Sequence, residues 1–406
     1  MMPPSFSPTE RPSGSRLGRA IRHRFVGREV PVDPLPKPDD RTPADWEVIE
    51  YWRAGPVALR IRADSGKAMR EVAEVLGDLA TPISPVAGAH DLALLRVETD
   101  GPSDMLAYLD GDLVVTASSS PQAAQALMVV LARLATDAEP GAVHLHAALV
   151  ELDSEAMLVV GPRGSGKSTL AAAAALAGAT VHTDELVSLW SDRLAVTGFP
   201  RPITLRHDMV AALALPDRSP APGVVPLNLL GPRATGEALT PTALVFPTRD
   251  DDAPMVQPIE PHAAMARLVL EVLDVGRDLD AVAALAATVP AWQIAPKVPD
   301  DGPRLLLEVA EAVAATPVAA KRARGAAGTG DLTTALQRGE ARGYGFSTGG
   351  VLLGATGVVV QLDPVGFEYW RQAHGRAPVD TVVGDLEVDP APFQSLSAEL
   401  RALHLL

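Results

Sequence analysis

One short stretch, Val159–Leu170 (VVGPRGSGKSTL), constrains the fold of this 406-residue chain more than any other part of its sequence. It matches the pattern G-x-x-x-x-G-K-[ST] from Gly161 to Ser168, with an apolar strand-like run before it and an alanine-rich, helix-like run after it. Glycines let backbone N–H groups converge on phosphate oxygens, and the start of the following helix adds a favourable dipole. The stretch therefore predicts a strand-loop-helix unit that binds the phosphates of a nucleotide.

Each position of this loop has an expected role in binding ATP and Mg²⁺. The nucleotide-binding residues are predicted to be Gly161, Pro162, Arg163, Gly164, Ser165, Gly166, Lys167, Ser168 and Thr169. Lys167 supplies a point charge to the β- and γ-phosphates, and Ser168 is expected to hold Mg²⁺. ATP is favoured over GTP because the chain has no Asn-Lys-x-Asp motif of the kind that reads guanine.

Phosphoryl transfer also needs an acid near the loop, and Asp184 is the best candidate. It follows the short strand-like run ATVHT, and its neighbour Glu185 could help to bind the metal or raise the proton affinity of the pair. The rival is Asp274, which ends the run LVLEVLD. We interpret that run as helical instead, because apolar residues continue a helical period from Ala264 to Val275.

Two histidines, His144 and His146, alternate along a predicted strand and should face the same side of a sheet. No third ligand stands at a suitable spacing, so a zinc site is not expected.

Composition excludes several other functions. A net charge of −15 argues against a general nucleic-acid binder, and the absence of cysteine excludes disulfides and thiol catalysis. The chain has no apolar run of membrane-helix length and no signal peptide, so we expect a cytoplasmic enzyme without membrane contact.

The pattern along the chain predicts an α/β protein with an extra domain on either side of the loop-bearing one. The predicted segments are a disordered tail (1–45), a small α+β domain (46–139), a P-loop domain (140–316), a basic linker (317–330) and a C-terminal domain (331–406).

The apolar patterns also predict single elements within these domains. The small domain should contain the strands VALRIRA, DLALLRVET, MLAYLDG and DLVVTAS and the helices GKAMREVAEVLGDL and PQAAQALMVVLARLAT. A hairpin should join VHLHAALVEL to AMLVVG, which leads into the glycine loop. The C-terminal domain should contain the strands GGVLLGA and GVVVQLD and the helical segments PVGFEYWRQAHG, PVDTVVGDLEVD and PAPFQSLSAELRALHLL.

The order of parts from His146 through GPRGSGKST to HTDELVSL resembles the catalytic domain of the HPr kinase/phosphorylase family. The family phosphorylates a serine hydroxyl on a P-loop fold related to phosphoenolpyruvate carboxykinase. The resemblance implies that residues 140–316 form a kinase domain, that Asp184 accepts the hydroxyl proton, and that His146 supports this acid.

The chain departs from that family in two respects. The acidic pair is Asp-Glu rather than Asp-Asp, and the family's E-x-R-G-x-G segment is replaced by Val196–Arg206, VTGFPRPITLR. HPr as substrate and the reverse phosphorylase reaction are therefore both in question. Arg201 or Arg206 is expected to supply charge to the transition state, with solvation of a strand edge as the alternative for either residue.

The segment from Gly349 to Leu406 resembles a PqqD-like domain, a winged-helix-type module that recognises precursor peptides of ribosomally made, modified peptides. The resemblance rests on the strand GVVVQLD, the helix start LDPVG and the closing helix PAPFQSLSAELRALHLL. It implies that the peptide adds as a strand at Gly357–Leu362 and packs against Phe393–Leu403. A purely structural cap is the alternative.

Together these features predict an ATP- and Mg²⁺-dependent kinase that phosphorylates a serine-type hydroxyl on a precursor peptide or small protein. The predicted catalytic residues are Asp184, His146, Lys167, Glu185 and Arg206, and the predicted metal ligands are Ser168, Asp184 and Glu185. The alternatives are a kinase of a carrier protein or small metabolite, and a non-catalytic ATP-binding peptide scaffold. Assembly into a homo-oligomer is left open.

Overall fold

A computed structural model gives the fold of the chain as two compact units, Met1–Leu131 and Ala132–Leu406. The residues described are 46–77, 80–97, 104–215, 223–231, 236–250, 252–253, 255–273, 279–315, 332–338, 341–355, 357–373, 390–403 and 405. The predicted tail (1–45) and linker (317–330) lie outside them. The second unit contains the residues of both the predicted P-loop domain and the predicted C-terminal domain.

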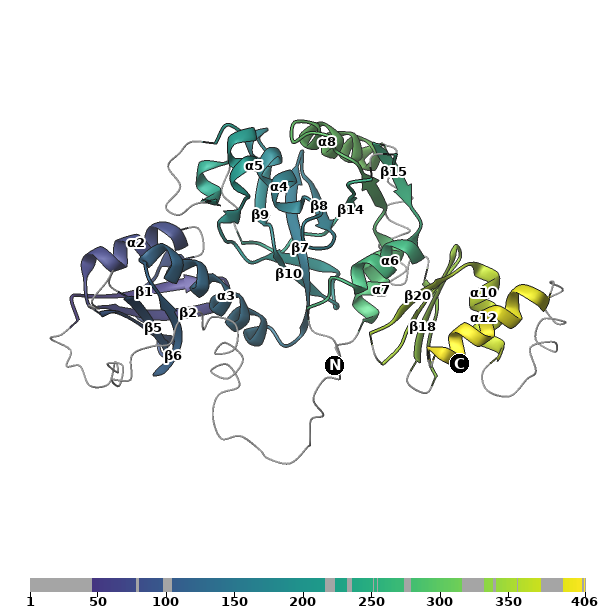
Figure 1. The fold of residues 1–406 in the computed structure, drawn as a ribbon, viewed down its shortest axis with the longest axis horizontal. Helices are drawn as coiled ribbons and strands as arrows, with labels where there is room; N and C mark the ends of the chain where they lie inside the picture. Colours follow the sequence, from purple (N-terminus) through teal and green to yellow (C-terminus); the bar gives the residue numbers. More distant parts are fainter. Residues whose placement is uncertain are drawn as a thin grey trace, which may run out of the picture. The chain divides into compact units, whose positions relative to one another are not determined.

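The first unit is a mixed sheet with the strand order β3-β1-β2-β4-β5-β6 (Figure 1). Its elements are β1 (Val48–Ala54), β2 (Val57–Ala63), α2 (Gly66–Leu76), β3 (Ala80–Pro82), β4 (His90–Val97), β5 (Asp104–Leu109), β6 (Asp112–Ala117) and the start of α3 (Ser120–Ala138). Strands β2 and β4 are parallel and are connected through α2. The elements predicted here are present, whereas β1 and β3 were not anticipated.

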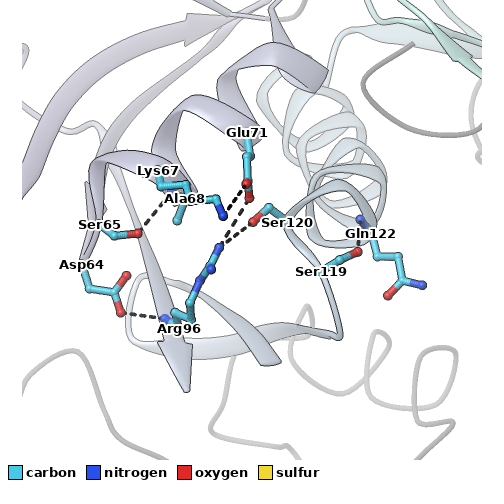
Figure 2. Close-up of polar contacts among 9 residues, drawn as sticks. All are labelled: Asp64, Ser65, Lys67, Ala68, Glu71, Arg96, Ser119, Ser120 and Gln122. Atoms are coloured by element: carbon cyan, nitrogen blue, oxygen red, sulfur yellow. Dashed lines mark hydrogen bonds and ion pairs between the residues drawn. The ribbon is translucent and has the colours of Figure 1, made fainter. Parts of the chain in front are cut away.

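Polar contacts fix the starts of both helices of the first unit (Figure 2). Ser65 caps α2, since its Oγ accepts a hydrogen bond from the backbone N–H of Ala68 at 3.1 Å. The guanidinium of Arg96 on β4 lies 3.4 Å from the carboxylate of Glu71 on α2 and 3.4 Å from the hydroxyl of Ser120 on α3. The contacts of Arg96 therefore connect both helices to β4 within the unit.

The second unit contains a large mixed sheet with the order β11-β10-β7-β8-β14-β16-β15, in which β9 also pairs with β7. Its strands are β7 (Ala142–Leu152), β8 (Glu155–Val160), β9 (Thr180–Thr183), β10 (Leu186–Trp190), β11 (Ala195–Gly198), β14 (Ala243–Pro247), β15 (Val256–Ile259) and β16 (Ala291–Ile294). Strands β8, β14 and β16 are parallel, and the other pairs are antiparallel. Beside this sheet lie the short pieces β12 (Ile203–Thr204), α5 (His207–Ala212), β13 (Val224–Val225) and a 3-10 turn, η3 (Leu227–Leu229).

Helices cover both faces of this sheet. Val159 and Val245 pack with α4 (Lys167–Leu176) and α8 (Asp301–Ala314). The residues that follow them, Val160 and Phe246, point to the opposite face and pack with α6 (Pro261–Val269) and α7 (Asp280–Thr288). The alternation of side chains along a strand therefore assigns α4, the helix of the loop, to one face.

The hairpin predicted between β7 and β8 is confirmed. Its turn residues Asp153 and Ser154 have φ of 51° and 66°. Positive φ at both central positions is the type I′ geometry whose twist suits a two-residue hairpin. The hairpin places β8 directly beside β7 and sends its end into the glycine loop.

The C-terminal part contains more strands than the two that the sequence predicted. Strands β17 (Leu332–Arg338), β18 (Ala341–Phe346), β19 (Gly349–Leu353) and β20 (Val359–Leu362) form an antiparallel sheet in that order, followed by α10 (Pro364–Ala373) and α12 (Pro390–Ala402). The predicted helical segment PVDTVVGDLEVD lies outside the described residues. In Figure 1 this sheet stands beside α6 and α7, in agreement with their shared apolar cluster.

Among the described residues, no helix combines the length and apolar character needed to cross a lipid bilayer.

Candidate phosphate-binding site

The glycine loop joins the end of β8 to the start of α4 and leaves an open space above its backbone. Gly164 and Gly166 have φ of 85° and 104°, in the left-handed region that favours glycine. A Cβ built at either position would meet no atom within 4 Å. Gly166 is the N-cap of α4 and provides no side-chain hydrogen bond, so the helix start is open to an anion.

The remaining loop residues line the same bend. The exposed ones are Pro162, Arg163 and Gly164. Ser165 donates its backbone N–H to the carbonyl of Pro162 at 3.0 Å, which closes the turn. Its Oγ is buried and has no hydrogen-bond partner among the described residues. A Cβ at Gly161 would lie 3.0 Å from that oxygen, so a side chain at Gly161 would crowd it. Thr169, the last predicted member, is half-buried in the first turn of α4.

Lys167 is buried at the centre of the site. Its Nζ donates to the carbonyl oxygen of Gly161 and, at 3.3 Å, to that of Pro162. Burial lowers the pKa of the ammonium group, while the carboxylates of Glu271, Asp184 and Glu185 oppose that shift. The lysine is thus folded back onto its own loop, where three carboxylates act on its charge.

Asp184 is the most buried acid of the site, at 3% exposure. It is hydrogen-bonded to the Ser168 side chain, and its Oδ1 lies 3.8 Å from Nε of Arg201. That Oδ1 has no hydrogen-bond partner within the part of the chain that the structure describes. Burial raises the pKa of Asp184, and the nearby guanidinium of Arg201 opposes that shift only in part. The half-exposed Glu185 forms an ion pair with the same arginine.

A bend between β9 and β10 brings the acidic pair to the loop. The hydroxyl of Thr183 accepts hydrogen bonds from the N–H groups of Glu185 at 3.3 Å and Leu186 at 3.4 Å, which holds the bend. Ala147 of β7 donates to the carbonyl of Glu185 at 3.2 Å, and it pairs with Val160 on its other side. The start of the loop and the acidic pair therefore flank one residue of β7.

A fourth segment completes the site, and it corrects the predicted helix over 264–275. Helix α6 ends at Val269, and Val272 forms an antiparallel bridge with Leu145 of β7. The backbone N–H of His146 donates to the carbonyl of Glu271 at 2.8 Å, and its Nδ1 lies 3.0 Å from the Glu271 carboxylate. Pairing with the free edge of β7 outweighs the helical periodicity here. Asp274, the rejected rival, lies outside the described residues.

The structure brings together most of the residues that the sequence singled out, with one exception and one addition. Arg206 is exposed and pairs with Asp208 in the first turn of α5, so the structure does not place it against the acidic pair. Arg201 occupies that position instead. Glu271 was missed as a site residue, because only its pairing with β7 moves it next to His146.

The oxygens of the site fit Mg²⁺ but do not form a complete metal site. The Ser168 hydroxyl and the unpartnered Oδ1 of Asp184 are the hard donors that this ion prefers. Within the described ranges, no three His, Cys, Asp or Glu side chains group closely enough to hold a metal. Mg²⁺ at this place would depend on phosphate and water for its other ligands, as is usual for nucleotide-bound magnesium.

Comparisons with known proteins add little to this geometry. No family model matches the chain, and no curated protein matches it. Among solved structures, the Hpr(Ser) kinase/phosphatase from Coxiella burnetii is similar at 13% identity and a TM-score of 0.27, over 42% of this chain and 94% of that one. A TM-score this low supports no conclusion about function, so both family resemblances stay predictions from the sequence.

Proposed function

We propose that the chain transfers the γ-phosphoryl group of ATP, with Mg²⁺, to a hydroxyl group. The observation that carries this proposal is the set of contacts at the loop. An open glycine bend and an uncapped helix start stand beside a buried lysine, and a serine hydroxyl bonds a buried aspartate. A loop, a lysine and a paired serine and aspartate are the parts that P-loop enzymes use to bind nucleotide and metal.

In this proposal each residue binds or orients a reactant. The open backbone between Gly161 and Gly166 binds the phosphates, and Lys167 turns from the loop carbonyls to the β- and γ-phosphates. Ser168 and Asp184 hold the Mg²⁺, which when bound offsets charge on the phosphate oxygens. The side chain of Arg201, which is 10% exposed, forms ion pairs with both acids and so holds them in place. Catalysis then comes mainly from positioning and charge stabilisation.

We propose a serine-type hydroxyl on a ribosomally made precursor peptide as the acceptor. The PqqD-like resemblance supports this choice, and so does β20, which ends the C-terminal sheet within the described residues. Val359 and Val360 on that strand are half-buried, while Gln361 is exposed. A peptide strand could pair along such an edge and raise its own concentration near the P-loop unit.

The nucleotide half of the proposal is tested by calorimetry with ATP and Mg²⁺. Lys167→Met should weaken binding about 10- to 100-fold, the usual cost of one charged hydrogen-bond donor to an anion. Lys67→Met, at an exposed helix position outside the site, is the matched control and should bind as the unaltered chain does. Equal affinities for the two variants would refute the assignment of the loop.

The transfer half is tested by mass spectrometry of short peptides encoded beside the gene, after incubation with the full chain and ATP. We expect a gain of one phosphate on a serine, and its loss when that serine is replaced by alanine. If peptide processing persists in Asp184→Asn with no phosphate gained at any stage, the chain is a scaffold. Phosphate found only on a carrier protein or small metabolite would replace the peptide with that acceptor class.

A further inference from the structure

The segment Glu271–Leu273 occupies the place that β8 leaves when it enters the glycine loop. Strand β8 pairs with β7 up to Val160 opposite Ala147. One residue further along β7, the backbone N–H of His146 is bonded to Glu271 instead, and the N–H of Leu273 donates to the carbonyl of His144 at 2.9 Å. The buried carboxylate of Glu271 is therefore fixed by backbone pairing immediately beyond the start of the loop.

His146 points to the face of the sheet on which the loop's helix begins. Even-numbered residues of β7 such as Ala148 and Val150 pack in the cluster that contains α4. By the alternation of a strand, His146 projects from that same face, where Lys167 and Ser168 start the helix. Of the carboxylates that oppose the lowered pKa of Lys167, Glu271 has the largest effect, which agrees with a position of the pair close to that lysine.

The pairing of His146 with Glu271 decides which ring nitrogen of His146 can accept a proton. The Nδ1 atom, 3.0 Å from a carboxylate oxygen that can only accept, must carry the proton in that hydrogen bond. In the neutral ring the lone pair then belongs to Nε2, for which the described residues provide no hydrogen-bond partner. A carboxylate that orients an imidazole in this way also stabilises the imidazolium that forms when Nε2 takes up a proton.

Resting on the function proposed above, we propose that Glu271 is a positioning residue that makes His146 the proton acceptor of the transfer. As the hydroxyl oxygen of the acceptor bonds to the γ-phosphorus, the bond from that phosphorus to the β–γ bridging oxygen breaks and ADP leaves. The hydroxyl proton passes to Nε2 of His146, and the imidazolium later gives it to water. Asp184 then has the separate role of holding the metal together with Ser168. Its hydrogen bond with Ser168 and its contact with Arg201 are consistent with that role.

The ring nitrogens can be read directly in the full-length, ¹⁵N-labelled chain by NMR, with His146→Asn to assign the signal. We expect His146 to carry its proton on Nδ1, and we expect Glu271→Gln to weaken that preference, because a carboxamide can also donate. The chain contains a matched pair outside the site, since His182 meets Glu151 through Nε2 at 3.2 Å. That ring should show the opposite tautomer and should respond only to Glu151→Gln. A proton on Nε2 of His146 in the unaltered chain would overturn the positioning role.

The kinetic test uses Mg²⁺ and ATP with water as the acceptor, so that no peptide need be known. Glu271→Gln should lower kcat about 100-fold, within the usual range for general acid-base catalysis, and should leave the affinity for ADP unchanged. Glu151→Gln should retain the full rate.

A Glu271→Gln variant with full kcat but an altered tautomer would show that His146 does not take the proton. If the unaltered chain transfers phosphate to neither water nor a peptide, the proposed function and the proton-acceptor role fall together, whereas the tautomer still decides whether Glu271 orients the ring.

Discussion

A buried carboxylate opposes folding at any pH where it is charged, and Asp184 is the clearest case among the described residues of the site. Burial raises the pKa of Asp184, so the folded chain binds its proton more readily than the unfolded chain does. In the pH range between its ordinary pKa and the raised one, the folded state holds more protons than the unfolded state. The free energy of unfolding contributed by this group is thus fully present at low pH and is lost as the pH rises through the raised pKa.

Replacing Asp184 with Asn should therefore stabilise the metal-free protein at neutral pH while it abolishes transfer. We expect a gain of about 1 kcal/mol, the common size of a stabilising change at an active site. The gain should shrink as the pH falls through the raised pKa, because the natural side chain then becomes neutral as well. Thermal unfolding in EDTA at several pH values measures it. Glu185→Gln is the control, because that side chain is 48% exposed and should give no such gain. A destabilised Asp184→Asn at pH 7 would contradict this account.

At the same scale, sequence alone could identify the residues that are close to the loop along the chain. Lys167, Ser168 and Asp184 belong to a local pattern of strand, loop, helix and strand, and such patterns can be recognised by spacing. Glu271 could not be found in this way, because it lies 125 residues from His146 and is brought there by sheet pairing. The sequence could not decide between Arg201 and Arg206 either. Arg206 forms an ion pair with the neighbouring Asp208, which leaves Arg201 to pair with the two acids of the site.

Among the elements, the C-terminal sheet is built around glycines that make room for aromatic rings of α10. A Cβ at Gly343 would lie 2.2 Å from Trp370, and one at Gly350 would lie 2.0 Å from Phe367. Both rings are buried in the cluster that joins β19 to α10 and α12. The sequence signal for these strands was weak because glycine lowers strand propensity, which explains why β18 was not predicted.

Gly350→Ala should therefore lower the free energy of unfolding by about 1–3 kcal/mol, the usual cost of overpacking a core. Chemical denaturation followed by circular dichroism gives this value. Gly141→Ala is a suitable control, because the nearest atom to its Cβ would be 3.9 Å away. Equal stabilities of the two variants would show that the ring of Phe367 moves aside at no cost.

The helix after Pro261 illustrates a second limit at the element scale. Its apolar period continues past Val269, and periodicity alone therefore predicted a helix that runs to Val275. The chain instead leaves the helix at that point, since the edge of β7 offers backbone hydrogen bonds once β8 has departed. The local apolar pattern favoured a longer helix, whereas β7, which is far away in the sequence, favoured the antiparallel bridge.

For the molecule as a whole, the C-terminal sheet shares a core with the unit that carries the loop. Tyr344 and Val351, both 0% exposed, pack in one cluster with residues of α6, α7 and the large sheet. Tyr344 also donates its hydroxyl to Asp280 at the start of α7, at 3.1 Å. Removing residues 331–406 to test peptide delivery would therefore also expose apolar core, and a loss of activity would not report on delivery alone.

Val351→Ala should lower the melting temperature of the whole second unit. The melting temperature measured with ATP present should fall by a similar amount. The expected cost is about 2 kcal/mol, for two buried methyl groups and the cavity that they leave. Val365→Ala on α10, where the side chain is 40% exposed, should change the melting temperature little. Calorimetry with and without nucleotide compares them. A separate early transition in Val351→Ala would show that the C-terminal sheet unfolds independently.

The bridge between β7 and the segment that follows α6 also sets an order of events during synthesis. His146 leaves the ribosome long before Glu271, because 125 residues separate the two. At ordinary elongation rates this interval is on the order of 10 s. During that time His146 of the nascent chain has no Glu271 to pair with. The contact that orients His146 is therefore among the later ones of the site to form, whereas the contact between Ser168 and Asp184 joins residues that have already been made.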